Sequence, residues 1–133
     1  HATMTKDQHL TEKYLLQCVD FLSMVPNYGC PVAELGNLNL DLANAYNLLG
    51  AFYMQTAEKD KALLALDKAK KILDALHNEN PKNGRTLYLL AVNQFWLGDF
   101  NNSMTYVADA QKLNYPIPDD FIKGLKDASP PEK

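Results

Sequence analysis

Histidines, cysteines and acidic residues are the side chains of this chain that could perform acid–base, nucleophilic or metal chemistry. His9 and His77 are remote in sequence, and neither has a neighbour spaced as a second metal ligand. Cys18 and Cys30 match no metal-binding or redox spacing. The chain also carries no glycine-rich phosphate loop, nucleophile elbow or Glu-x-x-His pair. We therefore predict no catalytic residue, no metal site and no cofactor, and we expect a protein that is not an enzyme.

The acidic residues are explained by their positions in helices and turns. Asp60, Asp67 and Asp74 recur every seven residues with lysines between them, which is typical of a solvated helix face with spaced ion pairs. Four further aspartates are explained by turn, helix-start and surface positions: Asp99, Asp109, Asp119 and Asp120. For the two cysteines we expect free thiols, and the alternative is a disulfide in an exported protein.

Composition narrows the class of partner. The chain has 133 residues, of which 47% are hydrophobic, so it is long enough for one domain with its own core. Its 13 basic residues are outnumbered by 16 acidic ones, giving a net charge of −3 and no electrostatic reason to expect nucleic acid. No apolar run reaches the roughly 18 residues that a membrane-spanning helix needs. Composition therefore gives no reason to expect nucleic acid as a partner or a membrane-spanning segment.

The N-terminus bears on localisation. His1-Ala2-Thr3 resembles a vector scar before Met4, so residues 1–4 are excluded from the fold. If Met4 is the natural start, no apolar signal region follows and a cytoplasmic location is expected. If a signal peptide has been trimmed, the protein is exported.

Helical spacing of apolar residues predicts a series of short helices joined by polar turns. Residues 5–25 form the first, with Thr5 and Gln8 as a capping box, and a long loop follows over 26–38. Further helices are predicted at 39–57, 60–78, 84–97, 100–114 and 119–127, and residues 128–133 are a frayed tail.

Two stretches of the chain share the same internal spacing 41 residues apart. Leu49 corresponds to Leu90, Ala62 to Ser103 and Ala69 to Ala110, with small residues matching small ones and large matching large. A duplicated helix pair must stack on its neighbours to bury its apolar face, and the stack leaves a curved surface. That arrangement favours binding over chemistry.

The residues of the first copy resemble a known repeat signature. Tyr46-x2-Leu49-Gly50-x2-Tyr53 is followed by Ala62-x3-Leu66-x2-Ala69, and the second copy keeps Leu97-Gly98-Asp99-Phe100 at its turn. This pattern resembles the tetratricopeptide repeat (TPR) family, whose unit has about 34 residues. The period of 41 implies about seven extra residues, and Pro81 indicates that they lengthen the second helix of the first repeat.

The resemblance implies an all-α fold, a TPR-like stack of antiparallel helix pairs with about six helices in a single domain over 5–127. The first repeat would cover 39–81 and the second 82–116. Two repeats are fewer than a stable array needs, so we expect the helix at 5–25 and the segment 117–127 to cap the two ends. The alternative is that one open end pairs with a second copy, forming a homodimer, or with a different subunit.

In the TPR family the first helix of each repeat lines a concave groove that holds partner peptides. Carried over by position, the partner-binding residues would be Asn44, Asn47, Ala51, Met54 and Gln55 in the first copy, and Arg85, Tyr88, Val92, Phe95 and Trp96 in the second. The amides of Asn44 and Asn47 would hold an extended segment, and the aromatic residues with Met54 would supply apolar pockets. Because Arg85 is the one basic residue in this set, the pattern does not favour a carboxylate clamp.

The expected function is therefore a non-catalytic protein–protein interaction module, or adaptor, that binds a peptide or helix of a partner protein in a groove. One alternative is a small TPR-type secretion chaperone that keeps a client soluble. A second is a structural assembly subunit that uses the helix at 60–78 or an open end.

Overall fold

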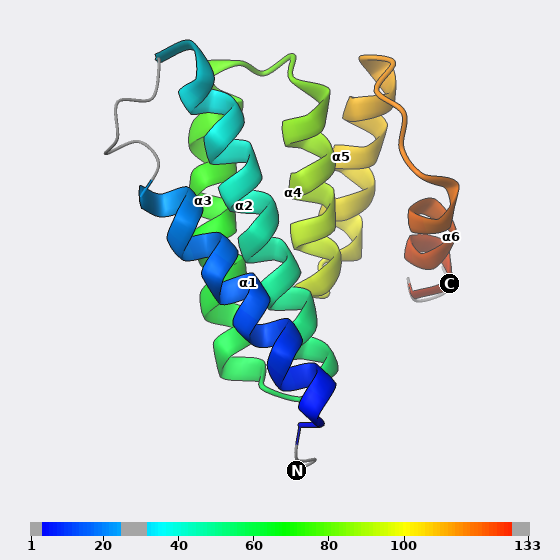
Figure 1. Cartoon of the computed structure of the whole chain (residues 1–133). Coiled ribbons are helices and arrows are strands. Elements are labelled where there is room, and N and C mark those ends of the chain that lie inside the picture. Colours follow the sequence, from blue (N-terminus) through cyan, green and yellow to red (C-terminus); the bar gives the residue numbers. More distant parts are fainter. Residues whose placement is uncertain (1–3, 25–31, 129–133) are drawn as a thin grey trace.

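The computed structural model describes residues 4–24 and 32–128, without the side chains of residues 32–37, and it is all-helical over these ranges (Figure 1). The helices are α1 (Lys6–Met24), α2 (Val32–Gln55), α3 (Lys59–Glu79), α4 (Gly84–Trp96), α5 (Phe100–Lys112) and α6 (Asp119–Ala128). The predicted all-α fold of about six helices is confirmed. The predicted vector scar and the C-terminal tail lie almost wholly outside the described residues.

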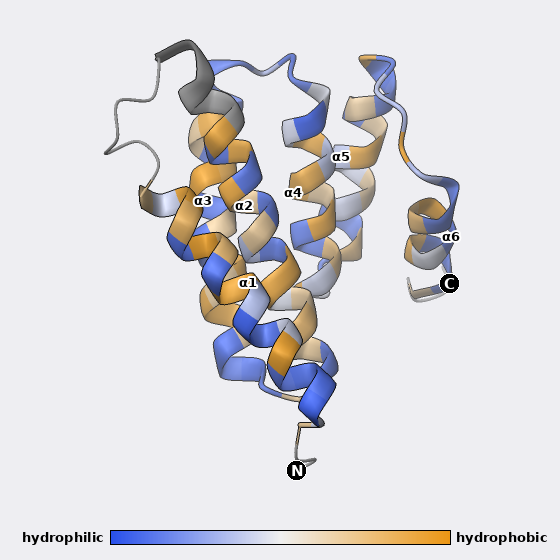
Figure 2. Cartoon of the chain, viewed as in Figure 1, coloured by the Kyte–Doolittle hydropathy of each residue, from blue (hydrophilic) through white to orange (hydrophobic). Residues whose placement is uncertain are grey.

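The central helices form two layers. α2 and α4 lie in front, α3 and α5 lie behind them, and each front helix packs against the helix that follows it in the chain (Figure 1). α1 packs against α2, and α6 packs against α5 at the other end of the array. Apolar and polar residues alternate along these helices (Figure 2), as expected for helices that bury one side. Both ends of the four-helix array thus have a further helix against them.

The turns within the two helix pairs have the same geometry, 41 residues apart. Ala57 and Gly98 both adopt the left-handed conformation, with φ of 61° and 83°. The amide that follows each of them closes the helix by donating to a carbonyl five residues back: Glu58 to Tyr53 at 2.8 Å, and Asp99 to Gln94 at 2.9 Å. This is the usual way of ending a helix with a left-handed residue.

The positions that correspond in the two helix pairs are buried in both. Ala62 and Ser103 are fully buried, as are Ala69 and Ala110. Where α4 and α5 meet, the Ser103 hydroxyl donates a hydrogen bond of 2.7 Å to the carbonyl of Ala91. Small side chains here let the helices of each pair approach closely.

The extra residues of the first pair lie in α3, as predicted. α3 has 21 residues and α5 has 13, although their starting residues, Lys59 and Phe100, are 41 apart. The added turns carry Leu73, which is fully buried in a cluster with Leu40 and Leu90. The longer α3 is therefore part of the core.

The predicted loop over 26–38 is wrong in its second half. Residues 26–31 lie outside the described residues, but α2 begins at Val32 and includes Gly36 and Asn37. Glycine in a helix costs about 1 kcal/mol relative to alanine, which is small beside the packing of the turns that follow. Leu40 and Ala43 are both buried in the core, so tertiary packing offsets the unfavourable local propensity.

α1 is held to the array by its inner face. The predicted capping box is present, because the Thr5 amide donates to Gln8 Oε1 at 2.8 Å and the Gln8 amide donates to Thr5 Oγ1 at 3.1 Å. Leu15 and Val19 are buried in the cluster that contains Leu49. The predicted free thiol of Cys18 is confirmed, and Cys30 lies outside the described residues.

A tyrosine hydroxyl joins α1 to α2. Tyr53 donates a hydrogen bond of 2.7 Å to Glu12 Oε2. Burial and then this hydrogen bond raise the pKa of Tyr53 above its ordinary value of 10.0. Since the folded-state pKa exceeds the unfolded one, the neutral hydroxyl contributes its full stability below pH 10 and loses it as the pH rises through the folded-state pKa.

We therefore expect the free energy of unfolding to fall above about pH 10, the ordinary tyrosine pKa, and to fall less steeply in Tyr53→Phe. At neutral pH the variant should be less stable by about 1 kcal/mol, because one hydrogen bond is lost. Urea denaturation at several pH values measures both effects. Equal alkaline slopes in the two proteins would contradict the assignment.

Candidate partner-binding face

Two contacts fix the register of α2 and α4, the helices predicted to line the groove. Arg85 is the second residue of α4, and its Nη2 lies 2.8 Å from Oδ1 of Asp41, which is more than two turns into α2. Between one and two turns further along, the Asn47 side-chain amide donates to the Leu89 carbonyl at 3.0 Å. The two helices therefore run side by side in the same direction, and positions 44 residues apart lie roughly level.

One stripe of each helix is left at the surface. Residues at intervals of three, four or seven share a helix face, so the ion pair of Asp41 and Arg85 identifies the stripes that continue along α2 and α4. We call these stripes the α2–α4 face, which comprises Asn44, Leu48, Ala51 and Gln55 of α2 and Arg85, Val92 and Trp96 of α4. Each of these residues is exposed or half-buried.

Leu48 is the most distinctive residue of the α2–α4 face. It is 49% exposed, although it lies in the middle of a helix whose neighbouring residues, Asn47 and Leu49, are buried. Leu48 is not among the partner-binding residues predicted from the sequence. The available signal was its spacing, because Leu48 lies four residues after Asn44 and three before Ala51.

The α2–α4 face carries little charge. α2 has no charged side chain after Asp41, and α4 has none after Arg85. Asp41 and Arg85 neutralise each other as an ion pair at the edge of the face. In contrast, α3 carries aspartates and lysines along its surface, with ion pairs of 3.1 Å between Lys71 and Asp67 and 2.7 Å between Lys70 and Asp74. These two pairs confirm the predicted solvated face of α3.

The prediction that Asn47 contacts a partner is wrong. Asn47 is 1% exposed, and its side chain both donates to Leu89 and accepts from Asn93 Nδ2 at 3.0 Å. Buried amides are stable when they are hydrogen-bonded in this way. Asn47 therefore joins α2 to α4 inside the protein and has no free group to offer.

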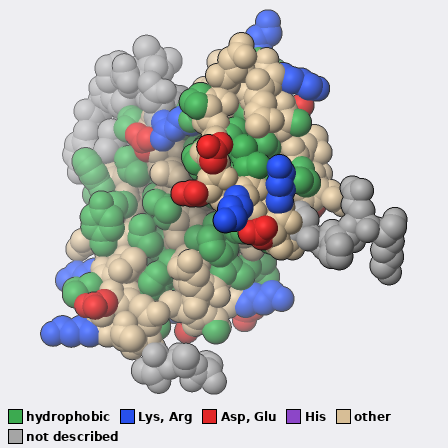
Figure 3. Space-filling view, turned by 90° about the vertical axis from the view of Figure 1, so that its right-hand side faces the viewer, with side chains coloured by type: hydrophobic (Ala, Val, Ile, Leu, Met, Phe, Trp, Pro, Cys, Tyr) green, Lys and Arg blue, Asp and Glu red, His purple; other side chains and the backbone are tan. Residues whose placement is uncertain are grey.

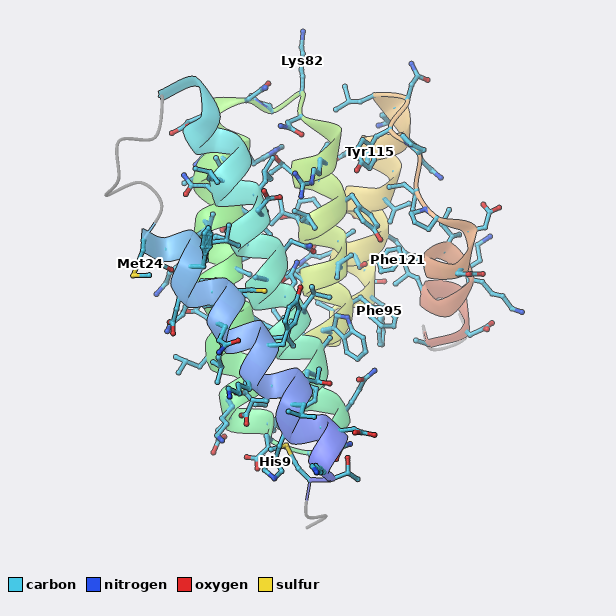
Figure 4. The ribbon with its side chains drawn as sticks, in the orientation of Figure 1. His9, Met24, Lys82, Phe95, Tyr115 and Phe121 are labelled. Atoms are coloured by element: carbon cyan, nitrogen blue, oxygen red, sulfur yellow. The ribbon has the colours of Figure 1, made fainter. Side chains whose placement is uncertain are left out.

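Tyr88 and Phe95 are covered by α6, which corrects their predicted role as open pockets. The Phe121 ring lies edge-on to both, with centroid distances of 5.6 Å to Tyr88 and 5.7 Å to Phe95 (Figure 4). Tyr115, from the segment before α6, stacks on Tyr88 at 6.1 Å. Burial and then Tyr115 raise the pKa of Tyr88, as expected for a phenol held among aromatic rings.

The remaining predicted residues separate into two groups. Met54 is half-buried and packs in part against the cluster shared by α1, α2 and α3. The others belong to the α2–α4 face, in agreement with the helical spacing: Asn44, Ala51, Gln55, Arg85, Val92 and Trp96. Trp96 is half-buried, and its ring meets Phe95 edge-on at 5.3 Å.

A second feature is a surface cleft of about 320 Å³ between α1, α2 and α3. Its floor includes Leu49, and its rim carries lysines whose ammonium groups lie over tyrosine rings. Lys61 Nζ is 5.5 Å from the ring centroid of Tyr53, and Lys68 Nζ is 5.6 Å from that of Tyr46. Such cation–π contacts hold the lysine stems over the apolar floor. Sequence reasoning did not find this cleft, because it needs α1 to be placed beside α3.

Metal and membrane features can be assessed over the described ranges. Among the side chains that the structure describes, in residues 4–24 and 38–128, no three histidine, cysteine, aspartate or glutamate side chains lie together as a metal site would require. No helix of residues 4–24 and 32–128 has the length and apolar character needed to cross a membrane.

The chain was compared with protein-family models, with curated proteins and with solved structures, and none of the three comparisons gives a match. The resemblance to the TPR family therefore stays a prediction that rests on the residues quoted above.

Proposed function

We propose that this chain is a non-catalytic interaction module that binds a segment of a partner protein across the α2–α4 face. The proposal rests mainly on the exposure of Leu48, which is 49% exposed at the centre of a nearly uncharged surface formed by two helices. Isolated surface leucines need no explanation, but Leu48 lies among apolar and amide side chains on two parallel helices. An uncharged surface of this kind loses little free energy of solvation when a partner covers it.

The chemistry of the face indicates the class of segment that it would bind. Leu48 and Val92 lie roughly level on the two helices and would contact an apolar side chain, with the half-buried Trp96 one turn further along α4. The amides of Asn44 and Gln55 can both donate to and accept from a peptide backbone or polar side chain. Because Arg85 is already paired with Asp41, a free carboxylate is not favoured.

The partner segment would accordingly be a short, largely uncharged peptide or helix with one or two large apolar residues. A helix would present such residues at intervals of three or four, which matches the two parallel stripes of the face. Binding would bury Leu48 at the centre of the contact, where apolar anchors contribute most.

We expect Leu48→Glu to weaken partner binding at least about tenfold, since it places a charge at the centre of an apolar contact. The matched control is Leu64→Glu on α3. Leu64 is 60% exposed and lines the cleft between α1, α2 and α3. The measurement is the amount of partner retained by each tagged variant from a native extract, after circular dichroism has verified equal helicity. If Leu48→Glu retains the partner and Leu64→Glu loses it, the partner binds at the cleft between α1, α2 and α3 and not at the α2–α4 face.

A further inference from the structure

α1 has a second apolar face that points away from the array. Its inner face buries Leu15 and Val19, yet four large apolar residues of the same helix are at least half exposed: Leu10 at 56%, Tyr14 at 65%, Phe21 at 56% and Met24 at 50%. In Figure 3 hydrophobic side chains gather on the left of the molecule. Scattered apolar residues are ordinary on a surface, but these form one continuous stripe.

The spacing of the stripe is that of a two-stranded coiled coil. Leu10, Tyr14, Gln17, Phe21 and Met24 are separated alternately by four and three residues, which is the heptad pattern of the residues at a helix–helix seam. Gln17 is its one polar member. A run of this kind in an amphipathic helix usually packs against a second helix. No other helix of the described residues lies on this side of α1.

The charged residues beside the stripe favour an antiparallel orientation of the second helix. Lys13 and Asp20 flank the stripe on one side, both are exposed, and neither forms an ion pair with another described residue. In an antiparallel pair of α1 helices, Leu10 lies opposite Phe21 of the second copy and Tyr14 lies opposite its Gln17. That register places Lys13 beside Asp20 of the second copy, and by symmetry it does so twice.

We infer that the outward face of α1 binds a second copy of this chain, forming a two-fold symmetric antiparallel helix pair. A parallel pair lacks this support, because Lys13 would then approach Cys18 of the second copy. The inference is independent of the partner-binding proposal, because the outward face of α1 and the α2–α4 face share no residue.

The size of the contact indicates its strength. The four apolar side chains are half exposed or more, so pairing buries about 400 Å² per copy, against roughly 800 Å² per partner in a standard stable interface. We therefore expect a weak dimer that dissociates on dilution. Sedimentation velocity over micromolar to submillimolar concentrations measures this equilibrium.

Charge reversal provides the decisive test. Lys13→Glu alone and Asp20→Lys alone should each weaken self-association at least about tenfold, because each places two like-charged pairs across the contact. An equimolar mixture of the two variants should associate again, since every pair across the mixed dimer is then of opposite sign. Both positions are exposed, so circular dichroism should show unchanged helicity.

A wild type that stays monomeric at all concentrations would overturn the inference. So would a wild-type dimer that either single variant retains, or a mixture of variants that stays monomeric while the wild type dimerises. The last result would show that the copies meet by another surface or in another orientation.

Discussion

Replacing Asn93 by alanine should lower the free energy of unfolding by about 3 kcal/mol, the largest loss that we expect from a single amide. Asn93 is fully buried, and its Nδ2 donates to the Leu66 carbonyl at 2.8 Å and to Asn47 Oδ1 at 3.0 Å. Its Oδ1 accepts from Gln94 Nε2 at 3.0 Å. Alanine removes the partner of Asn47 Oδ1 and of Gln94 Nε2, both on buried residues, and each buried group without a partner costs about 1–3 kcal/mol.

The matched control is Asn101→Ala, which removes the same amide from an exposed position near the start of α5. It should change stability by no more than about 0.5 kcal/mol, as surface substitutions usually do. Urea denaturation of the two variants and the wild type gives the comparison. If Asn93→Ala lowers the free energy of unfolding no more than Asn101→Ala does, the hydrogen bonds of Asn93 that join α2, α3 and α4 do not stabilise the fold.

Gly50→Val should destabilise the protein by about 2–3 kcal/mol, because there is no room for a side chain at this position. A Cβ at Gly50 would lie 2.5 Å from Leu66 Cδ2, and Leu66 is itself fully buried. Helix propensity acts in the opposite direction, since valine is a slightly better helix former than glycine. The overlap outweighs this gain because Leu66 is fully buried and would have to move for the valine to fit.

Gly124→Val in α6 separates the effect of steric overlap from the effect of helix propensity. Its added Cβ would meet no atom within 4 Å, so only the helix propensity changes and stability should stay level or rise slightly. Thermal unfolding of both variants followed by circular dichroism measures the difference. If Gly50→Val is as stable as Gly124→Val, the close approach of α2 and α3 at Leu66 is not a constraint on the sequence.

Most of the helical architecture could be predicted, because it depends on local patterns. The capping box at Thr5, the turn at Gly98 and the longer α3 follow from side chains close to one another in the sequence. The start of α2 could not be predicted in this way. Gly36 and Asn37 favour a turn locally, and only the packing of the turns that follow makes the helix longer.

The candidate site was harder to predict because helical spacing gives stripes but not the neighbours that cover them. Asn44 and Asn47 are the same residue type on one helix, yet Asn47 is buried since Asn93 and Leu89 satisfy its amide. Phe95 was expected to be open, but α6 turns back and places Phe121 against it. Each error concerns a contact between segments that are distant in the sequence.

The most direct test of the central claim is site-specific photo-crosslinking in a native extract. A photoreactive phenylalanine analogue replaces Leu48 on the α2–α4 face in one variant, and Met104 in the other. Met104 is the control because it is 39% exposed on α5, in the opposite layer. We expect one dominant protein adduct from position 48, absent from position 104 and reduced when unmodified chain is added as a competitor. The same adducts from both positions, or adducts from position 104 alone, would contradict partner binding across the α2–α4 face.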